Sequence, residues 1–513
     1  MELLLLPLIF VAIVLGFKFI VESMFGLKGS QVAGANSIFR PANLLLALLD
    51  FDRWRRLRQE GATFMDQKEL QKLLNPNNKG LLIDGKDRRM SLASSFTHNM
   101  IVAPTGAGKT TRYVIPNLLT MDDCSFVVTD PAGELFAQTA GALQAKGFEV
   151  QVFAPESPNY SLQYNPLSNL SSFAHIDQVA QTIIRSAYPD ASGDTQFFND
   201  GATDVISMLI RCLMAAGPEY LNLGNVQYLL QSWGDLGSGL NEFMRKYADD
   251  TADAQFRGFI AGNEKTTQSF ISTATTALKP LNDPEMQNLL CRNELRFEGL
   301  RERKTALFFI LPSNKVKFYS FLMNLFYVDL FDVLMQKLPH NERAAGRKFL
   351  PVHLMMDEFG HTSIPEFSTV CTTIRKHEVS LSVILQYFSQ LETNYGKAEA
   401  QTIIEGGFQS KMFLPGLSTQ ASQEVEAMLG KQLVNEVRWD GQSNFREQNL
   451  MNADRIRTMA DNKAIFMTSN KEAIMLETMR SFENKRFVQQ MRRKYTGTIQ
   501  RRGLSHFQRV PLT

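Results

Sequence analysis

The stretch IVAPTGAGKTTRYVIPN, residues 101–117, decides the predicted fold. An apolar run ends near Ala103, and Gly106 and Gly108 then precede Lys109 and two threonines. A strand, a glycine-containing turn and a helix in this order form the phosphate-binding loop of many nucleotide-binding proteins. The usual pattern is GxxxxGK[ST], and Ala103 replaces its first glycine. The remaining positions match, so an ordinary glycine-rich turn is the weaker interpretation.

Such a loop predicts a site for ATP and Mg²⁺. Backbone N–H groups of the loop and of the helix N-terminus converge on the β-phosphate. We expect Lys109 to reach the β- and γ-phosphates, and the Thr110 hydroxyl to bind Mg²⁺. The candidate nucleotide-binding residues are Thr105, Gly106, Ala107, Gly108, Lys109, Thr110 and Thr111.

A nucleotide-hydrolysing site also needs an acid at the end of a neighbouring strand. VHLMMDEFG, residues 352–360, places Asp357 and Glu358 directly after an apolar run. We expect Asp357 to hold Mg²⁺ through its hydration shell, and Glu358 to polarise the attacking water. Asp130, in VVTDPAGEL, also follows an apolar run. It lies closer to the loop in sequence, and we assign it a supporting role.

Two further polar residues are candidate catalytic groups. Gln386 follows the predicted strand LSVIL, where a polar side chain is placed to sense the γ-phosphate; a strand-capping amide is the alternative. Arg375, in TTIRKHE, lies between the strand that precedes Asp357 and the strand that precedes Gln386. It is a candidate arginine finger for a neighbouring subunit, although the sequence is equally compatible with a surface residue.

The pattern of apolar runs predicts an α/β fold. Continuous apolar strands that alternate with helices are typical of a parallel sheet covered by helices on both faces. Between Asn169 and Leu300 strand signals are few and helical signals many, which predicts an all-α domain inserted into the α/β domain. The predicted strands are residues 100–103, 125–129, 149–154, 305–311, 352–357, 381–385 and 411–414.

The N-terminus predicts a membrane anchor. Residues 3–17 are uncharged and the apolar run resumes after Lys18 as far as Val21, which is enough for one spanning helix. Basic residues follow this run and none precedes it, so we expect the rest of the chain to face the cytoplasm. A cleaved signal peptide is the alternative, but the basic n-region of such a peptide is missing from the sequence.

Composition and charge limit which classes of protein the chain can belong to. A hydrophobic content of 44% and a charged content of 21% exclude wholesale disorder. The four cysteines lie far apart without a CxxC pair, which predicts reduced thiols rather than zinc ligands or disulfides. From Arg480 onward nine basic residues face one acid, Glu483. This block predicts a solvated tail, or one that contacts nucleic acid or anionic lipid.

Several motifs in a fixed order resemble one family, the type IV secretion coupling proteins (TraG/TraD-like conjugation ATPases). The motifs are APTGAGKTT, VVTDPAGEL, YNPL, LMMDEFG and the run TTIRKHEVSLSVILQYFSQL, and they fall within residues 95–480. The resemblance implies a RecA-like motor with an inserted all-α domain, assembled as a homo-hexamer at the bacterial inner membrane. It also implies ATP-driven delivery of single-stranded DNA, relaxase–DNA complexes or protein cargo. The implied partners are secretion-channel ATPases and inner-membrane components.

The chain departs from the family pattern at both ends. Family members usually carry two N-terminal spans, whereas this sequence predicts one, and only a basic tail follows the motor. We therefore predict six parts, namely an anchor (1–28), a juxtamembrane linker (29–94), the first part of the nucleotide-binding domain (95–168), the inserted all-α domain (169–300), the second part of the nucleotide-binding domain (301–480) and a basic tail (481–513).

The leading hypothesis is a membrane-anchored ATPase that moves single-stranded DNA, or protein linked to it, into a secretion channel. A protein-only effector coupler is the first alternative. A pump of double-stranded DNA is the second, and the inserted helical domain and the TDPAGEL motif argue against it. A nucleotide-dependent recruitment scaffold is the third, and it is disfavoured because a scaffold has no need of a complete hydrolytic site.

Overall fold

The computed structural model describes residues 61–513 apart from 190–191, 362, 438–442 and 498–505. The predicted membrane anchor lies in residues 1–60, outside this part. Across the described residues, no helix combines the length and the apolar character needed to cross a bilayer. The chain divides into two units, one of residues 64–425 and 452–513 and a smaller one that includes residues 426–451.

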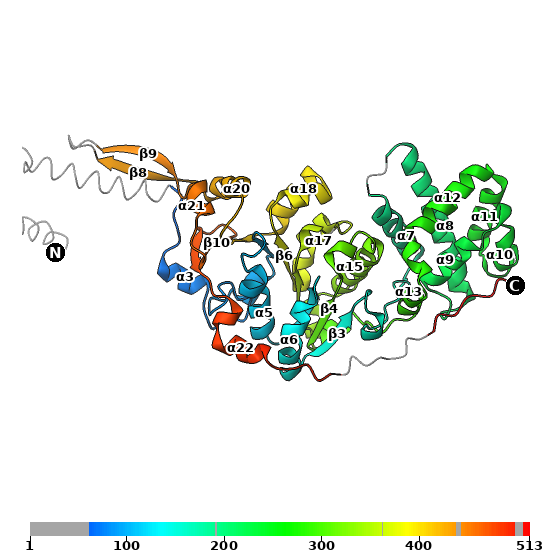
Figure 1. Cartoon of the computed structure of the whole chain (residues 1–513), viewed down its shortest axis with the longest axis horizontal. Helices are drawn as coiled ribbons and strands as arrows, with labels where there is room; N and C mark the ends of the chain where they lie inside the picture. Colours follow the sequence, from blue (N-terminus) through cyan, green and yellow to red (C-terminus); the bar gives the residue numbers. More distant parts are fainter. Residues whose placement is uncertain (1–60, 190–191, 362, 438–442, 498–505) are drawn as a thin grey trace, which may run out of the picture. The chain divides into compact units, whose positions relative to one another are not determined.

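A nine-stranded sheet forms the centre of the larger unit (Figure 1). Its strands are β1 (Asn99–Val102), β2 (Ser125–Thr129), β3 (Glu149–Phe153), β4 (Thr305–Phe309), β5 (Val352–Met356), β6 (Val379–Leu385), β7 (Ser410–Phe413), β10 (Lys463–Thr468) and β11 (Ile474–Glu477). Their order across the sheet is β11-β10-β7-β1-β6-β5-β2-β4-β3. Strands β1 to β7 run parallel, and β10 and β11 add an antiparallel edge.

The seven predicted strands are all present, with bounds that differ from the prediction by at most two residues. Strands β1, β4, β5 and β6 are buried over their whole length, as continuous apolar runs in a parallel sheet require. The prediction missed β10 and β11. The mixed α/β class with a parallel sheet is confirmed.

Helices cover both faces of this sheet. Phe308 in β4 packs edge-on against Phe136 in α6 (Glu134–Ala145), with ring centroids 5.5 Å apart. The next residue, Phe309, packs on the opposite face against Phe326 in α15 (Ser320–Met335), at 4.7 Å. Phe153 in β3 stacks on the same Phe326 at 5.8 Å. Alternate residues of each strand therefore bury against different helical layers.

Part of the predicted linker belongs to the core of the sheet unit. Leu81, Leu82 and Ile83 are at most 1% exposed and lie in the same apolar cluster as α5 (Ile115–Thr120) and β2. The Leu82 N–H donates to Asn117 Oδ1 at 2.7 Å, and Asn117 Nδ2 donates back to the Leu82 carbonyl at 2.8 Å. The described end of the 29–94 segment is therefore packed structure rather than a free connection.

Between β3 and β4 the described residues form helices and connections, with no strand (Figure 1). The α-helices are α7 (Phe173–Ala187), α8 (Asp194–Ala216), α9 (Leu223–Gln231), α10 (Asn241–Tyr247), α11 (Asp250–Ala261), α12 (Glu264–Ala277), α13 (Pro284–Leu289) and α14 (Gly299–Glu302). Helix α8 is central and packs against α7 and α9 to α12, while α7 also packs against α15. The predicted helical insertion is confirmed.

The tail differs from the solvated block that its charge predicted. Helix α22 (Lys485–Met491) packs against α6 through Phe487, which is 1% exposed. Farther on, Val510 is also 1% exposed. Phe487 and Val510, two apolar residues between the basic ones, are buried and hold the tail against the rest of the unit. The prediction missed this packing because it considered only the charges.

The smaller unit contains a hairpin that the sequence analysis did not predict. Strand β8 (Lys431–Val437) pairs antiparallel with β9 (Ser443–Asn449), and the Ala62 N–H donates to the Lys431 carbonyl at 2.8 Å.

Candidate nucleotide-binding site

The topology brings four predicted segments to one edge of the sheet. The phosphate-binding loop follows β1, Gln386 follows β6, Asp357 follows β5 and Asp130 follows β2. These four strands are neighbours in that order and all run parallel, so their carboxyl ends meet. Ligands of open α/β sheets bind outside such carboxyl ends.

The loop has the backbone of a phosphate cradle. Gly106 and Gly108 have φ angles of +83° and +79°, a region that residues with a Cβ rarely adopt. A Cβ on Gly108 would also lie 3.0 Å from Thr111 Oγ1. Ala103 instead continues the strand ladder, because its N–H donates to the Leu385 carbonyl at 2.9 Å. Ala103 is also absent from the residues with a positive φ, so this position of the loop does not require a glycine.

Three side chains converge beside this loop. Thr110 Oγ1 donates to Asp357 Oδ2 at 2.9 Å, and Lys109 Nζ lies 3.9 Å from Asp357 Oδ1. Asp357 is 8% exposed, and burial raises the pKa of its carboxyl while the Lys109 cation lowers it. A cation, a hydroxyl and a carboxylate next to an open glycine loop are the donor set that a magnesium nucleotide needs. The residues therefore fit ATP and Mg²⁺.

Glu358 is placed differently from its neighbour. Its φ of +54° turns the chain at the end of β5, and its carboxylate accepts a hydrogen bond from Ser313 Oγ, after β4. The Glu358 N–H donates to Asp357 Oδ1 at 3.0 Å. The turn thus points the two adjacent carboxylates to different partners, Asp357 to the loop and Glu358 to Ser313.

Asp130 holds the neighbouring turn. It is 2% exposed, its Oδ2 accepts the Phe136 N–H at 2.8 Å, and burial raises its pKa. Gly133 in this turn has a φ of +71°. The observed contact of Asp130 therefore orients the start of α6, at the same edge of the sheet as the loop.

The predicted Gln386 comes with a partner that sequence reasoning missed. The Gln386 and Tyr387 N–H groups donate to Gln390 Oε1 at 2.8 and 3.4 Å. The Gln390 amide lies against Gly360, where a Cβ would come within 2.4 Å of Gln390 Cδ. Gln390 thus ties the turn after β6 to the turn that carries Asp357. The paired glutamines in QYFSQL were the available signal.

A second missed group lies behind the loop. Arg112 is 1% exposed, its Nη1 donates to the Ala107 carbonyl and its Nη2 donates to the Asp461 carbonyl at 2.7 Å. Asp461 Oδ2 lies 3.1 Å from Arg112 Nη2 and 2.8 Å from Arg480 Nη2. These contacts tie the loop to residues that lie more than 300 positions later, which no local pattern reveals.

The structure does not bring Arg375 to this chain's own loop. It is exposed on the short 3₁₀ helix Ile374–His377, directly before β6 and so at the amino edge of the sheet. Its role toward a neighbouring subunit stays a prediction.

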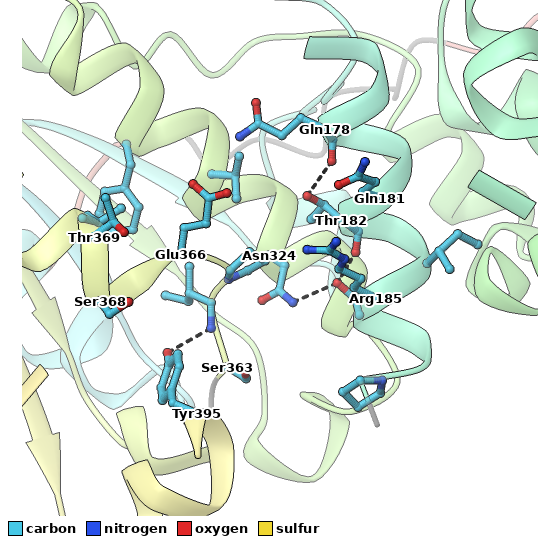
Figure 2. A pocket seen from close by; sticks show the side chains of 18 of the residues that line it. Gln178, Gln181, Thr182, Arg185, Asn324, Ser363, Glu366, Ser368, Thr369 and Tyr395 are labelled. Carbon is cyan, nitrogen blue, oxygen red and sulfur yellow. Dashed lines mark hydrogen bonds between the residues drawn. The ribbon is translucent and has the colours of Figure 1, made fainter. Parts of the chain in front are cut away.

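A separate cavity of about 840 Å³ lies between α7, α8, α15 and α17 (Phe367–Thr373) (Figure 2). Asn324 donates to Ser186 Oγ at its wall, and Tyr395 accepts the Ile364 N–H. The charged lining residues are Arg185, Asp200, Asp204, Asp332, Glu366 and Glu399. With one cation against five acids, this lining disfavours phosphate groups. This cavity is therefore a poorer candidate for a nucleotide than the loop edge.

Comparison with known proteins identifies the family. The sequence profile of a family described as "Type IV secretory system Conjugative DNA transfer" matches residues 57–503. The chain belongs to this family.

Curated members of the conjugative DNA-transfer family resemble part of the chain. Protein VirD4 of Rhizobium radiobacter is 27% identical over 317 residues, and Protein VirD4 of Agrobacterium fabrum is 26% identical over the same length. Each match covers 60% of this chain but only 44% or 46% of the relative. The chain therefore spans about half the length of the curated relatives it matches.

Solved structures of this family share the fold. The bacterial conjugative coupling protein TrwB, unbound, covers 82% of this chain with a TM-score of 0.63 at 15% identity, and 93% of its own chain is covered. The plasmid coupling protein TrwB in complex with ADP and Mg²⁺ covers 82% of this chain and 94% of its own, with a TM-score of 0.62. At 15% identity these likenesses show the fold alone, a mixed α/β domain with a largely parallel sheet and a helical insertion.

Proposed function

We propose that this chain is a coupling ATPase that drives DNA, or a relaxase–DNA complex, into a type IV secretion channel. The observation that carries the proposal is the convergence of Lys109, Thr110 and Asp357 beside the glycine loop. Membership of the conjugative DNA-transfer family supports the cargo, and the TrwB complex with ADP and Mg²⁺ supports the nucleotide.

The binding residues have separate tasks. Loop N–H groups from Thr105 to Thr111 cradle the phosphates, and Lys109 leaves Asp357 to neutralise phosphate charge. Thr110 and Asp357 hold the metal, and Arg112 fixes the loop through the Ala107 carbonyl. When bound, Mg²⁺ supplies charge neutralisation to the phosphate oxygens.

Three further residues act on the reaction and its outcome. Glu358 orients and polarises the attacking water, and its bond with Ser313 holds the carboxylate until a nucleotide arrives. Gln386 senses the terminal phosphate and passes its state through Gln390 to the turn at Gly360. Arg375 completes the site of a neighbouring subunit in a homo-hexamer.

The six parts keep their predicted bounds in this proposal. Residues 1–28 anchor the protein in the bacterial inner membrane, in contact with lipid, and residues 29–94 lead from the membrane into the motor. The motor comprises residues 95–168 and 301–480. The insertion, residues 169–300, binds cargo on the cytoplasmic side. Channel ATPases and inner-membrane components then take the cargo over from this chain. Residues 481–513 form the basic tail.

The test is ATP turnover by the full-length protein, with and without single-stranded DNA, beside Glu358→Gln. Glu366→Gln is a matched control, because Glu366 has the same unusual backbone, with φ +55°, but is exposed and lines the separate cavity. We expect DNA to stimulate turnover in the wild type and the control, and Glu358→Gln to lose at least about 100-fold. Turnover that ignores DNA would instead indicate a protein-only coupler, and turnover that survives Glu358→Gln would refute the catalytic assignment.

A further inference from the structure

The end of the chain lies on the helical insertion, far along the sequence from the helices that it touches (Figure 1). The Phe507 N–H donates to Asn288 Oδ1 in α13 at 2.7 Å. Val510, three residues later, is 1% exposed. The last described segment, residues 506–513, therefore packs on the insertion. We call the residues that it contacts there, Gly224, Asn225, Tyr228 and Asn288, the α9 groove.

Asn225 is the central residue of the α9 groove. It is 0% exposed, and its Nδ2 donates to the Gln508 carbonyl at 3.0 Å while its Oδ1 accepts the Val510 N–H at 2.9 Å. The same Nδ2 donates to the Tyr220 carbonyl at 2.9 Å. The amide thus takes the place of a peptide group in a neighbouring strand and pairs with main-chain atoms two residues apart. Such contacts recognise an extended backbone.

Side-chain seats flank Asn225. The Phe507 ring lies over Gly224, where a Cβ would come within 2.8 Å of it. The Arg509 guanidinium lies 5.1 Å from the centre of the Tyr228 ring, a cation–π contact. Because Val510 is buried, the groove accepts an aromatic residue, a cation and an aliphatic residue in fixed succession.

The Asn225 side-chain amide depends on the tail for two of its three hydrogen bonds. A buried amide without partners is costly, and native proteins avoid it. Both main-chain contacts that satisfy the outer side of this amide come from the tail. Among the described residues, the bond to the Tyr220 carbonyl is the one side-chain hydrogen bond that Asn225 makes within the insertion.

We propose that the α9 groove is a recognition site for extended peptides of the pattern aromatic–any–arginine–aliphatic, and that residues 507–510 are its resident, exchangeable ligand. A second chain with this pattern binds only after the tail leaves, so the tail is an intramolecular competitor. The proposal is independent of nucleotide hydrolysis.

The first test measures binding of a fluorescent peptide, HFQRVPLT (residues 506–513), to the full-length protein. A tethered segment competes at an effective concentration of roughly 1 mM, so wild type should bind the free peptide at least about tenfold more weakly than a variant with a released tail. Val510→Asp releases the tail because it buries a charge. Thr513→Asp adds the same charge at an exposed position and should behave as wild type.

A groove variant tests whether the peptide occupies the proposed site. Gly224→Leu fills the Phe507 seat on helix α9, and combined with Val510→Asp it should abolish peptide binding. Equal binding by wild type and Val510→Asp would overturn the proposal. Binding that survives Gly224→Leu would also overturn it.

A second measurement needs no variant. Excess unlabelled peptide at about 1 mM should accelerate deuterium uptake by residues 506–513 of the wild-type chain, since the free peptide displaces the tail. A scrambled peptide of the same composition should leave the uptake unchanged. Uptake that is insensitive to the HFQRVPLT peptide would show that the tail is a permanent part of the fold and would overturn the proposal.

Discussion

Asp357, the proposed metal ligand, lowers the stability of the fold when its carboxyl is ionised. Burial raises the pKa of its carboxyl, so folding favours the neutral form, and the Lys109 cation only partly offsets this. The sign follows from proton linkage. Because the folded state binds the proton more tightly, the free energy of unfolding falls as the pH rises from 3.8 through the raised pKa.

Asp357→Asn should therefore separate the two properties. The amide keeps an oxygen that accepts from Thr110 but removes the buried charge. We expect ATP turnover to fall at least about 100-fold, while the thermal midpoint at pH 7 stays the same or rises. Turnover and differential scanning calorimetry on the same preparation check both. A midpoint lower by several degrees would make Asp357 mainly structural.

The sequence predicted which residues would come together at the loop, but not all of their partners. Lys109, Thr110 and Asp357 were predicted as site residues because phosphate and metal chemistry restrict both residue type and spacing, and the structure brings these three side chains together. The contacts of Arg112 with Asp461, and of Gln390 with Gly360, were missed, because each depends on tertiary approach. Arg375 was predicted to lie between the strand before Asp357 and the strand before Gln386, and it does. The direction of β6 shows in addition that Arg375 lies at the opposite edge of the sheet from the loop.

At the scale of the element, strand β5 contains a buried histidine that makes the stability of the fold depend on pH. His353 lies in the middle of this apolar strand, fully buried near the rings of Phe96 and Phe126. Burial lowers its pKa to about 3 from 6.5. As the pH falls below 6.5, the unfolded chain takes up the proton first, so the folded state progressively loses stability down to about pH 3.

His353→Leu should remove this pH dependence. Between pH 7 and pH 5, the free energy of unfolding of the wild type should fall about 2 kcal/mol more than that of the variant. Urea unfolding at the two pH values measures the difference. His340→Leu, at an exposed position, is the matched control and should follow the wild type. Equal pH dependence in His353→Leu and wild type would contradict the assignment of this loss to His353.

Elements with strong patterns were predicted well. The parallel strands were found because burial on both faces gives unbroken apolar runs, as in VHLMM of β5. Strands β10 and β11 and the β8–β9 hairpin were missed. Strands β8 and β9 are rich in polar residues, as in SNFREQN, so neither periodicity nor apolar content marks them.

At the scale of the whole molecule, the C-terminal tail packs against the helical insertion. From charge alone, the tail was predicted to be solvated or to contact nucleic acid or anionic lipid, because nine basic residues outweigh one acid from Arg480 onward. Phe487 and Val510 nevertheless anchor this segment, one on the motor and one on the insertion. The described parts of the tail therefore contact both the sheet and the insertion, which the composition did not predict.

The central claim is that nucleotide hydrolysis at the loop edge moves DNA. It is tested most directly by ATP-driven displacement of streptavidin from biotinylated single-stranded DNA by the full-length protein in detergent. We expect displacement with ATP by the wild type and by Glu366→Gln, and none by Glu358→Gln or without ATP. If the wild type hydrolyses ATP in the presence of this DNA and never displaces streptavidin, the claim that this chain moves DNA is contradicted.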